Sequence, residues 1–167
     1  MELPGAGYFY ALATLSMAFV GFTSIVVVLH QGTGKPLSPL HVLITSLYVE
    51  LGLMATAFAI LAPTLAICGI REIRVWQVSS AIMLAVLVPW LVTYPLRRKV
   101  AAPKERLPLR WYIMTTLGSV SLVTLCLNLF GFIIDPGPGP LAITTVYILS
   151  YASVAFMGTY SFFLRDN

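Results

Sequence analysis

The sequence predicts an all-α, polytopic integral membrane protein with five transmembrane helices and short loops. The first observation is composition, because 59% of the 167 residues are hydrophobic and only 10% are charged, whereas soluble domains carry about 25% charged residues. The second is a set of five apolar segments, each longer than the 20 or so residues that cross a hydrocarbon core of about 30 Å. A soluble chain of this length could not bury so much apolar surface, so lipid must be its solvent.

The five segments are expected to form a single transmembrane domain over 1–167. They cover residues 8–30, 41–62, 75–95, 111–134 and 141–164. The breaks between them are rich in Gly, Pro and basic residues, as in HQGTGKPLSP, PLRRKVAAPKERLPLR and DPGPGP. Pro63 interrupts an apolar run that reaches Ile70, so the second helix either continues past a kink or ends in a short turn.

Lysine and arginine predict an orientation with the N-terminus outside and the C-terminus in the cytoplasm. Residues 96–110 hold six of the ten basic residues, and loops of this kind stay on the cytoplasmic side. Counting outward from that loop leaves only Arg71 and Arg74 outside. The first segment, LSMAFVGFTSIVVVLHQ, resembles segments of small membrane proteins common in bacteria, so we expect the bacterial inner (plasma) membrane.

The basic loop is interpreted as a contact with membrane lipid. Anionic headgroups attract nearby Lys and Arg by about 1 kcal/mol per residue. The net charge of +4 is therefore mostly a signal of orientation, and no nucleic-acid partner is expected. The residues expected at lipid headgroups are Arg97, Arg98, Lys99, Lys104 and Arg106.

Motifs for catalysis and metal binding are missing from the sequence. There is no HExxH and no CxxC, and GTGKP at 32–36 lacks the spacing and the Ser or Thr of a phosphate-binding loop. The loops are too short to form a soluble domain. We therefore expect no enzymatic activity, no cofactor and no metal site.

Glu50 is the most unusual residue of the second segment. It lies about 10–15 Å from the cytoplasmic end of that helix, at 1.5 Å per residue, and an ionised carboxylate there costs about 3 kcal/mol. We expect no basic partner, because the residues at matching depth are Gly21, Ser24, Ser119, Ser121, Ser150 and Ser153. Glu50 is then either a neutral acid bonded to hydroxyls, or a carboxylate that lines a wet cavity or binds a cation.

Small residues on the first two segments predict a packing interface, because small side chains let membrane helices approach closely. These residues are Gly21, Ser24, Gly52 and Thr56. The second helix carries Glu50 on one side and small residues on another. Such a helix belongs near the centre of a bundle or at a subunit interface.

A polar stripe follows one side of the fourth segment. It consists of Arg110, Ser121, Thr124, Asn128, Gly131 and Asp135. Two interpretations are open: the stripe packs against other helices, or it lines a narrow polar pathway. Asn128 is its clearest member, because an amide in hydrocarbon needs a partner. The candidate pathway or ion and proton site consists of Glu50, Ser121, Thr124, Asn128 and Asp135.

Three functions are consistent with these features. We favour a small homo-oligomeric channel or pore for ions, since one subunit of five short-looped helices has no room for a pore of its own. The first alternative is an accessory or scaffold subunit of a larger membrane complex, with partner membrane subunits. The second is a proton-coupled carrier of a small solute, although an odd number of helices without an internal repeat is unusual among carriers.

Overall fold

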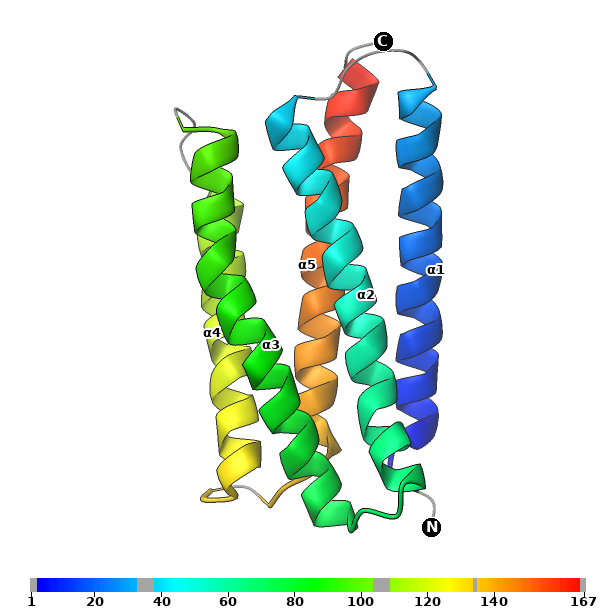
Figure 1. The fold of residues 1–167 in the computed structure, drawn as a ribbon, viewed down its shortest axis with the longest axis vertical. Coiled ribbons are helices and arrows are strands. Elements are labelled where there is room, and N and C mark those ends of the chain that lie inside the picture. The colour runs from blue at the N-terminus through cyan, green and yellow to red at the C-terminus, as the bar shows by residue number, and fades with distance from the viewer. Residues whose placement is uncertain (1–2, 33–37, 104–108, 134, 166–167) are drawn as a thin grey trace.

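The computed structural model describes residues 3–32, 38–103, 109–133 and 135–165, and these residues form five α-helices (Figure 1). Each helix is long and apolar enough to span a membrane. The prediction of an all-helical chain with five possible spans is therefore confirmed. The helices are α1 (Ala6–Gln31), α2 (Pro39–Ile67), α3 (Glu72–Ala101), α4 (Leu109–Phe130) and α5 (Pro138–Arg165).

The helix ends follow local chemistry. Ser38 caps α2, because its hydroxyl accepts a hydrogen bond from the backbone N–H of His41 at 3.3 Å. The helix then continues past Pro63 to Ile67. Of the two alternatives predicted from the sequence, continuation past Pro63 is therefore the one observed. The fourth helix ends at Phe130 instead of the expected residue 134, because Gly131 adopts a left-handed conformation with φ of 65°.

Four of the helices form a closed ring. In this ring α2 packs on α3, α3 on α4, α4 on α5, and α5 on α2. The first helix lies outside the ring, against α2 and, less extensively, against α5. The two ends of the chain lie at opposite ends of the bundle, as an odd number of antiparallel helices requires (Figure 1).

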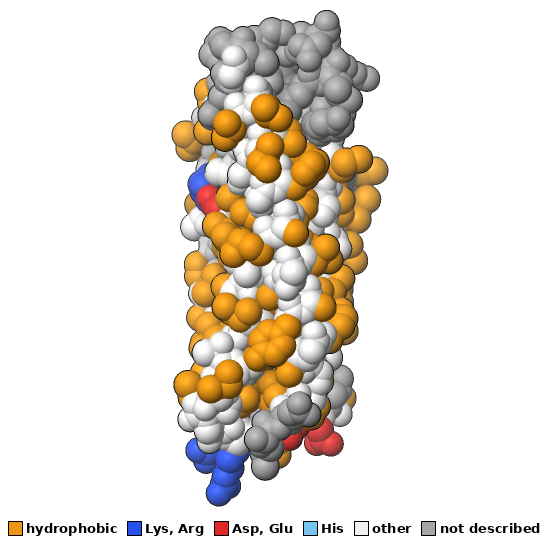
Figure 2. All heavy atoms as spheres, turned by 90° about the vertical axis from the view of Figure 1, so that its right-hand side faces the viewer, with side chains coloured by type: hydrophobic (Ala, Val, Ile, Leu, Met, Phe, Trp, Pro, Cys, Tyr) orange, Lys and Arg blue, Asp and Glu red, His pale blue; other side chains and the backbone are white. Residues whose placement is uncertain are grey.

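Buried apolar side chains of the ring form a single hydrophobic cluster, to which each of the four helices contributes at least one fully buried residue, among them Leu51, Met83, Leu125 and Ile148. The ring helices also bury polar side chains, such as Ser80, Asn128 and Thr144. The outer surface is also apolar, as expected for a chain solvated by lipid. Figure 2 views the bundle from the α1 side, with hydrophobic side chains along most of its length, charged ones at the end where α1 begins, and a further basic and acidic group at the left edge in the upper part.

Two glycines allow helices to approach closely. A Cβ added at Gly52 of α2 would lie 2.5 Å from a methyl carbon of Val20 and 3.4 Å from the ring of Phe19, both on α1. On α4, a Cβ at Gly118 would lie 2.6 Å from the hydroxyl of Tyr147 on α5. The glycine at 118 thus leaves room for Tyr147, whose hydroxyl donates a hydrogen bond to the Met114 carbonyl at 2.8 Å.

Replacing Gly52 with Leu should therefore weaken the packing of α1 on α2. Overpacking of this kind typically costs about 1–3 kcal/mol, so the midpoint of unfolding in mixed micelles should fall. Ala57→Leu is the matched control, since Ala57 is an exposed small residue on the same helix. An equal loss of stability in both variants would show that the Gly52 contact is not special.

Candidate functional site

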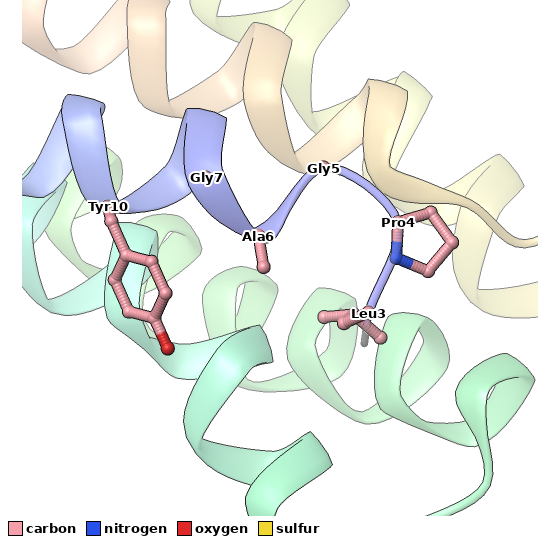
Figure 3. Close-up of a pocket in the computed structure, with 6 residues that line it drawn as sticks. All are labelled: Leu3, Pro4, Gly5, Ala6, Gly7 and Tyr10. Atoms are coloured by element: carbon pink, nitrogen blue, oxygen red, sulfur yellow. The ribbon is translucent and has the colours of Figure 1, made fainter. Parts of the chain in front are cut away.

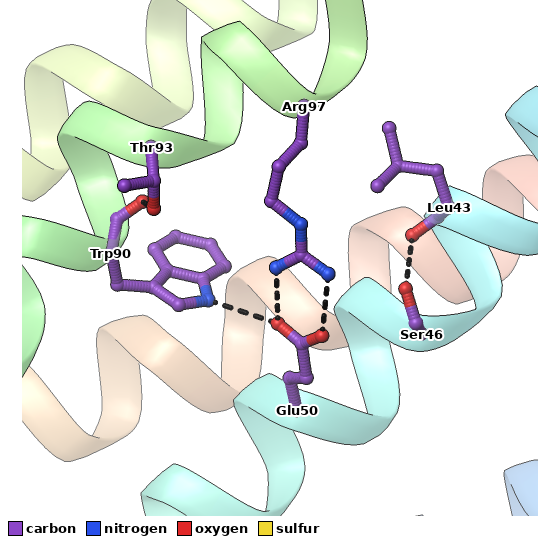
Figure 4. A network of polar contacts seen from close by, with 6 residues as sticks. All are labelled: Leu43, Ser46, Glu50, Trp90, Thr93 and Arg97. Atoms are coloured by element: carbon purple, nitrogen blue, oxygen red, sulfur yellow. Dashed lines mark hydrogen bonds and ion pairs between the residues drawn. The ribbon is translucent and has the colours of Figure 1, made fainter. Parts of the chain in front are cut away.

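An ion pair joins α2 to α3 in the half of the bundle that contains the C-terminus (Figure 4). Arg97 donates from Nη2 to Oε1 of Glu50 at 2.9 Å and from Nη1 to Oε2 at 3.0 Å. The indole Nε1–H of Trp90 donates to the same Oε2 at 3.2 Å. Both carboxylate oxygens are therefore bound, and the two-pronged guanidinium contact is the stronger, directional form of this interaction.

The expectation that Glu50 has no basic partner was wrong. The error came from comparing the depths of backbone positions. Side chains on a helix tilt toward its N-terminus, and α2 and α3 run in opposite directions, so Glu50 and Arg97 reach toward each other. The backbone positions of Glu50 and Arg97 lie at different depths, and the long arginine side chain spans that difference.

The spacing of residues on α3 was the signal that could have found this site. Trp90 and Arg97 are separated by seven residues, which places them on the same face of a helix two turns apart. Each supplies hydrogen-bond donors, and a carboxylate in hydrocarbon needs donors. A search of neighbouring antiparallel helices for such a pair of donors would have suggested Arg97.

Aromatic rings hold Trp90 in place. Its ring stacks on that of Tyr94, with centroids 5.6 Å apart and an angle of 12° between the planes. It also meets the edge of Tyr151 on α5, with centroids 6.4 Å apart. The donor to Glu50 is thus positioned by contacts within α3 and across to α5.

The ion pair is only partly covered by the protein. The side chain of Arg97 is 43% exposed and that of Glu50 is 37% exposed. A lone charge at this depth would be costly, whereas the pair has no net charge, and this reduces the cost of insertion. Chemically, the arrangement suits recognition of a polar group at the surface of the bundle better than uptake of a cation by a free carboxylate.

The candidate pathway residues of α4 lie mainly inside the protein. Asn128 is fully buried; its amide donates to Ser80 Oγ at 2.8 Å and its carbonyl oxygen accepts from the Gly137 N–H at 2.8 Å. Ser121 is 4% exposed, and the hydroxyl of Thr124 donates to its carbonyl oxygen at 2.8 Å. Asp135 is exposed in the loop between α4 and α5.

The four residues named for packing divide into two pairs. Gly52 is buried against α1, and the hydroxyl of Thr56 donates to the Gly52 carbonyl at 3.0 Å. In contrast, Gly21 is exposed, with nothing within 4 Å of the Cβ position. Ser24 is partly buried and donates to the Val20 carbonyl of its own helix at 2.8 Å. Gly21 therefore faces away from the rest of the chain.

The residues expected at lipid headgroups differ in their surroundings. Arg97 binds Glu50, Arg98 is only 8% exposed, and Lys99 is exposed. Lys104 and Arg106 lie outside the described residues. Within the described part of this group, Arg97 and Lys99 are thus exposed and Arg98 is buried.

A surface hollow of about 560 Å³ lies at the start of α1 (Figure 3). It is lined by Leu3, Pro4, Gly5, Ala6, Gly7 and Tyr10. The Tyr10 hydroxyl is the one polar side-chain group in this lining. Among the described residues the hollow is therefore lined by apolar side chains, backbone and this one hydroxyl.

Comparison of the chain with known proteins finds no family model that matches it, and no significant match among curated proteins or solved structures. The features that bear on function are therefore those of the chain itself. The geometry that bears on it is the Glu50–Arg97 pair, the buried stripe of α4 and the exposed face of α1.

Breaking the ion pair should destabilise the bundle. Glu50→Gln or Arg97→Gln leaves the other group with unsatisfied hydrogen-bonding capacity, which costs about 1–3 kcal/mol. The free energy of unfolding of the double variant should fall by less than the sum of the two single decreases, because its two amides can hydrogen-bond to each other. Equilibrium unfolding of the wild-type protein, the two single variants and the double variant measures this coupling. Strictly additive decreases in the free energy of unfolding would contradict the pairing.

Replacing Asn128 with Leu should destabilise the end of the bundle that holds the loop between α4 and α5. The change leaves the partly buried Gly137 N–H and the buried Ser80 hydroxyl without this partner, at a cost of about 1–3 kcal/mol. Thr124→Val is the control, since the Thr124 hydroxyl bonds only within its own turn. If Asn128→Leu left the free energy of unfolding unchanged but altered ion flux, the result would instead favour the pathway interpretation.

Proposed function

We propose that this chain is a subunit of a homo-oligomeric membrane assembly, held together by the outer face of α1. We propose further that the chain lies in a bacterial inner membrane, with its N-terminus outside and its C-terminus in the cytoplasm. The observation that carries the proposal is a line of small, exposed residues on α1: Gly7, Ala11, Thr14, Ala18 and Gly21. Their spacing alternates between four and three residues, which is the repeat of helices that wind around each other.

Larger exposed side chains flank this line. Leu15 is 57% exposed and Phe22 59% on one side, and Met17 is 52% exposed on the other. The small residues thus lie between larger exposed side chains, an arrangement against which a second copy of the same helix can pack. Small residues at such positions let helix backbones approach closely in lipid.

The contrast with the other glycines supports a partner at this face. Gly52 and Gly118 are buried, and each has a neighbouring helix packed against it. Gly7 and Gly21 also lie in a spanning helix, but nothing lies within 4 Å of a Cβ at either position. Glycine lowers intrinsic helix stability, so two glycines on one exposed line are best explained by a close contact with another chain.

Within such an assembly, an accessory or scaffold role fits the packing better than transport through one subunit. The four ring helices share a core cluster of apolar side chains, and the buried amide of Asn128 is bonded within the protein. A carrier that uses Glu50 as a proton site is less well supported, because Arg97 already compensates its charge.

An ion pore between subunits is the second candidate. The observation in its favour is that Glu50 and Arg97 lie partly exposed on the outside of the ring. If several copies met around this surface, the pair would line a shared axis. In that case the pathway would run between copies instead of along α4.

The proposal is tested by placing Leu at the centre of the α1 face. Ala18→Leu should weaken association by overpacking, by about 1–3 kcal/mol, which corresponds to a rise of roughly fivefold to 150-fold in the dissociation constant. Ala85→Leu is the matched control, an exposed alanine on α3. The measurement is the number of copies per complex in lipid vesicles, with ion flux recorded from the same vesicles.

The outcomes separate the candidates. A wild-type oligomer without flux, dispersed by Ala18→Leu alone, supports the scaffold subunit. Flux that disappears together with the oligomer supports the pore. A monomeric wild-type protein, or equal dispersal by Ala85→Leu, would contradict assembly through α1.

A further inference from the structure

A patch of polar side chains lies between α2 and α3 on the outside of the ring, away from the line of small residues on α1. This α2–α3 polar patch consists of Ser46, Glu50, Trp90, Thr93 and Arg97 (Figure 4). Ser46 and Thr93 bond to carbonyls of their own helices, at 2.9 and 3.2 Å. The charged groups of the patch are therefore Glu50 and Arg97, whose side chains are both partly exposed.

Arg97 has donors left over after it binds Glu50. A guanidinium carries five N–H groups, and Glu50 accepts one from each Nη atom. Three N–H groups have no acceptor among the described residues, on a side chain that is 43% exposed. In contrast, each oxygen of Glu50 already accepts at least one hydrogen bond, so the unused capacity of the pair is mainly that of a donor.

The position of Arg97 decides which acceptors are within reach. The α3 helix has 30 residues, about 45 Å at 1.5 Å per residue, against a hydrocarbon core of about 30 Å. Arg97 lies four residues before the last residue, Ala101, so its backbone is close to the boundary of the core. An arginine there normally extends toward the headgroups, but Glu50 holds this one in the opposite direction.

We propose that the α2–α3 polar patch binds the phosphate of an anionic phospholipid of the adjacent leaflet. The unused N–H groups of Arg97 donate to the phosphate oxygens, Glu50 fixes the plane of the guanidinium, and Trp90 fixes Glu50. Lipid phosphates are the acceptors that occur at this boundary, and charged side chains below it draw phosphates and water inward. The exposed Lys99 on the same helix adds attraction for an anionic lipid.

The test uses the purified full chain, stripped of lipid in detergent and then supplied with phosphatidylglycerol. Native mass spectrometry counts the lipids retained per chain, and diacylglycerol with the same acyl chains shows what the missing phosphate contributes. Arg97→Gln should weaken retention of phosphatidylglycerol about tenfold, as expected for the loss of charge-assisted hydrogen bonds. Lys99→Gln removes the same charge from an exposed neighbour and should change retention about twofold or less.

Two further variants keep the test decisive if Arg97→Gln does not fold. Thr93→Phe leaves all charges in place but puts a ring into the patch, and it should also reduce phosphatidylglycerol retention. Glu50→Gln keeps the charge of Arg97 but releases its guanidinium, and should give an intermediate loss. Helix content from circular dichroism identifies the variants that are folded.

Three results would overturn the lipid site. One is equal loss in Arg97→Gln and Lys99→Gln, which would indicate general attraction to a basic surface. Another is unchanged retention in Thr93→Phe and Arg97→Gln. The last is efficient cross-linking between two copies through Thr93→Cys in a background without the native cysteines, since a second copy of the chain would then cover the patch.

Discussion

Helices that span a membrane gain little from burying apolar surface, because lipid hydrocarbon is as apolar as the side chains that would be buried. Close packing and hydrogen bonds between helices must then bring them together. Several contacts that join helices accordingly involve glycines or polar groups, beside the apolar core that the helices share. Gly52 lets Val20 approach, Gly118 makes room for a tyrosine that bonds across to α4, and Gln77 of α3 donates to the Leu129 carbonyl of α4 at 3.1 Å.

The same constraint separates the polar groups of the chain into two kinds. Asn128 finds its partners inside, and its amide joins α3, α4 and the loop before α5. The Glu50–Arg97 pair is also satisfied within the chain, but it remains open to the surroundings. Groups of the first kind explain how the bundle holds together, while groups of the second kind point outward to a lipid or another chain.

The five helices could be predicted from the sequence, because composition and segment length depend only on the solvent. The partner of Glu50 could not be predicted in the same way. Its identity depends on which helices are neighbours and on how far side chains extend along the helix axes, and neither is encoded in the depth of a single residue. The ambiguity of the α4 stripe has a similar origin, because packing and pathway residues are chemically alike. The contacts of Asn128 favour packing, and they depend on a loop residue, Gly137, that no helical pattern includes.

The opposite directions of α2 and α3 give the Glu50–Arg97 pair a mechanical consequence. Because the two side chains reach toward each other along the helix axes, their hydrogen bonds resist sliding of one helix past the other. A shift by a single helical turn is about 5.4 Å, far more than a bond of 2.9 Å can accommodate. The pair therefore sets the register between α2 and α3, and with it the height at which Trp90 meets Tyr151 of α5.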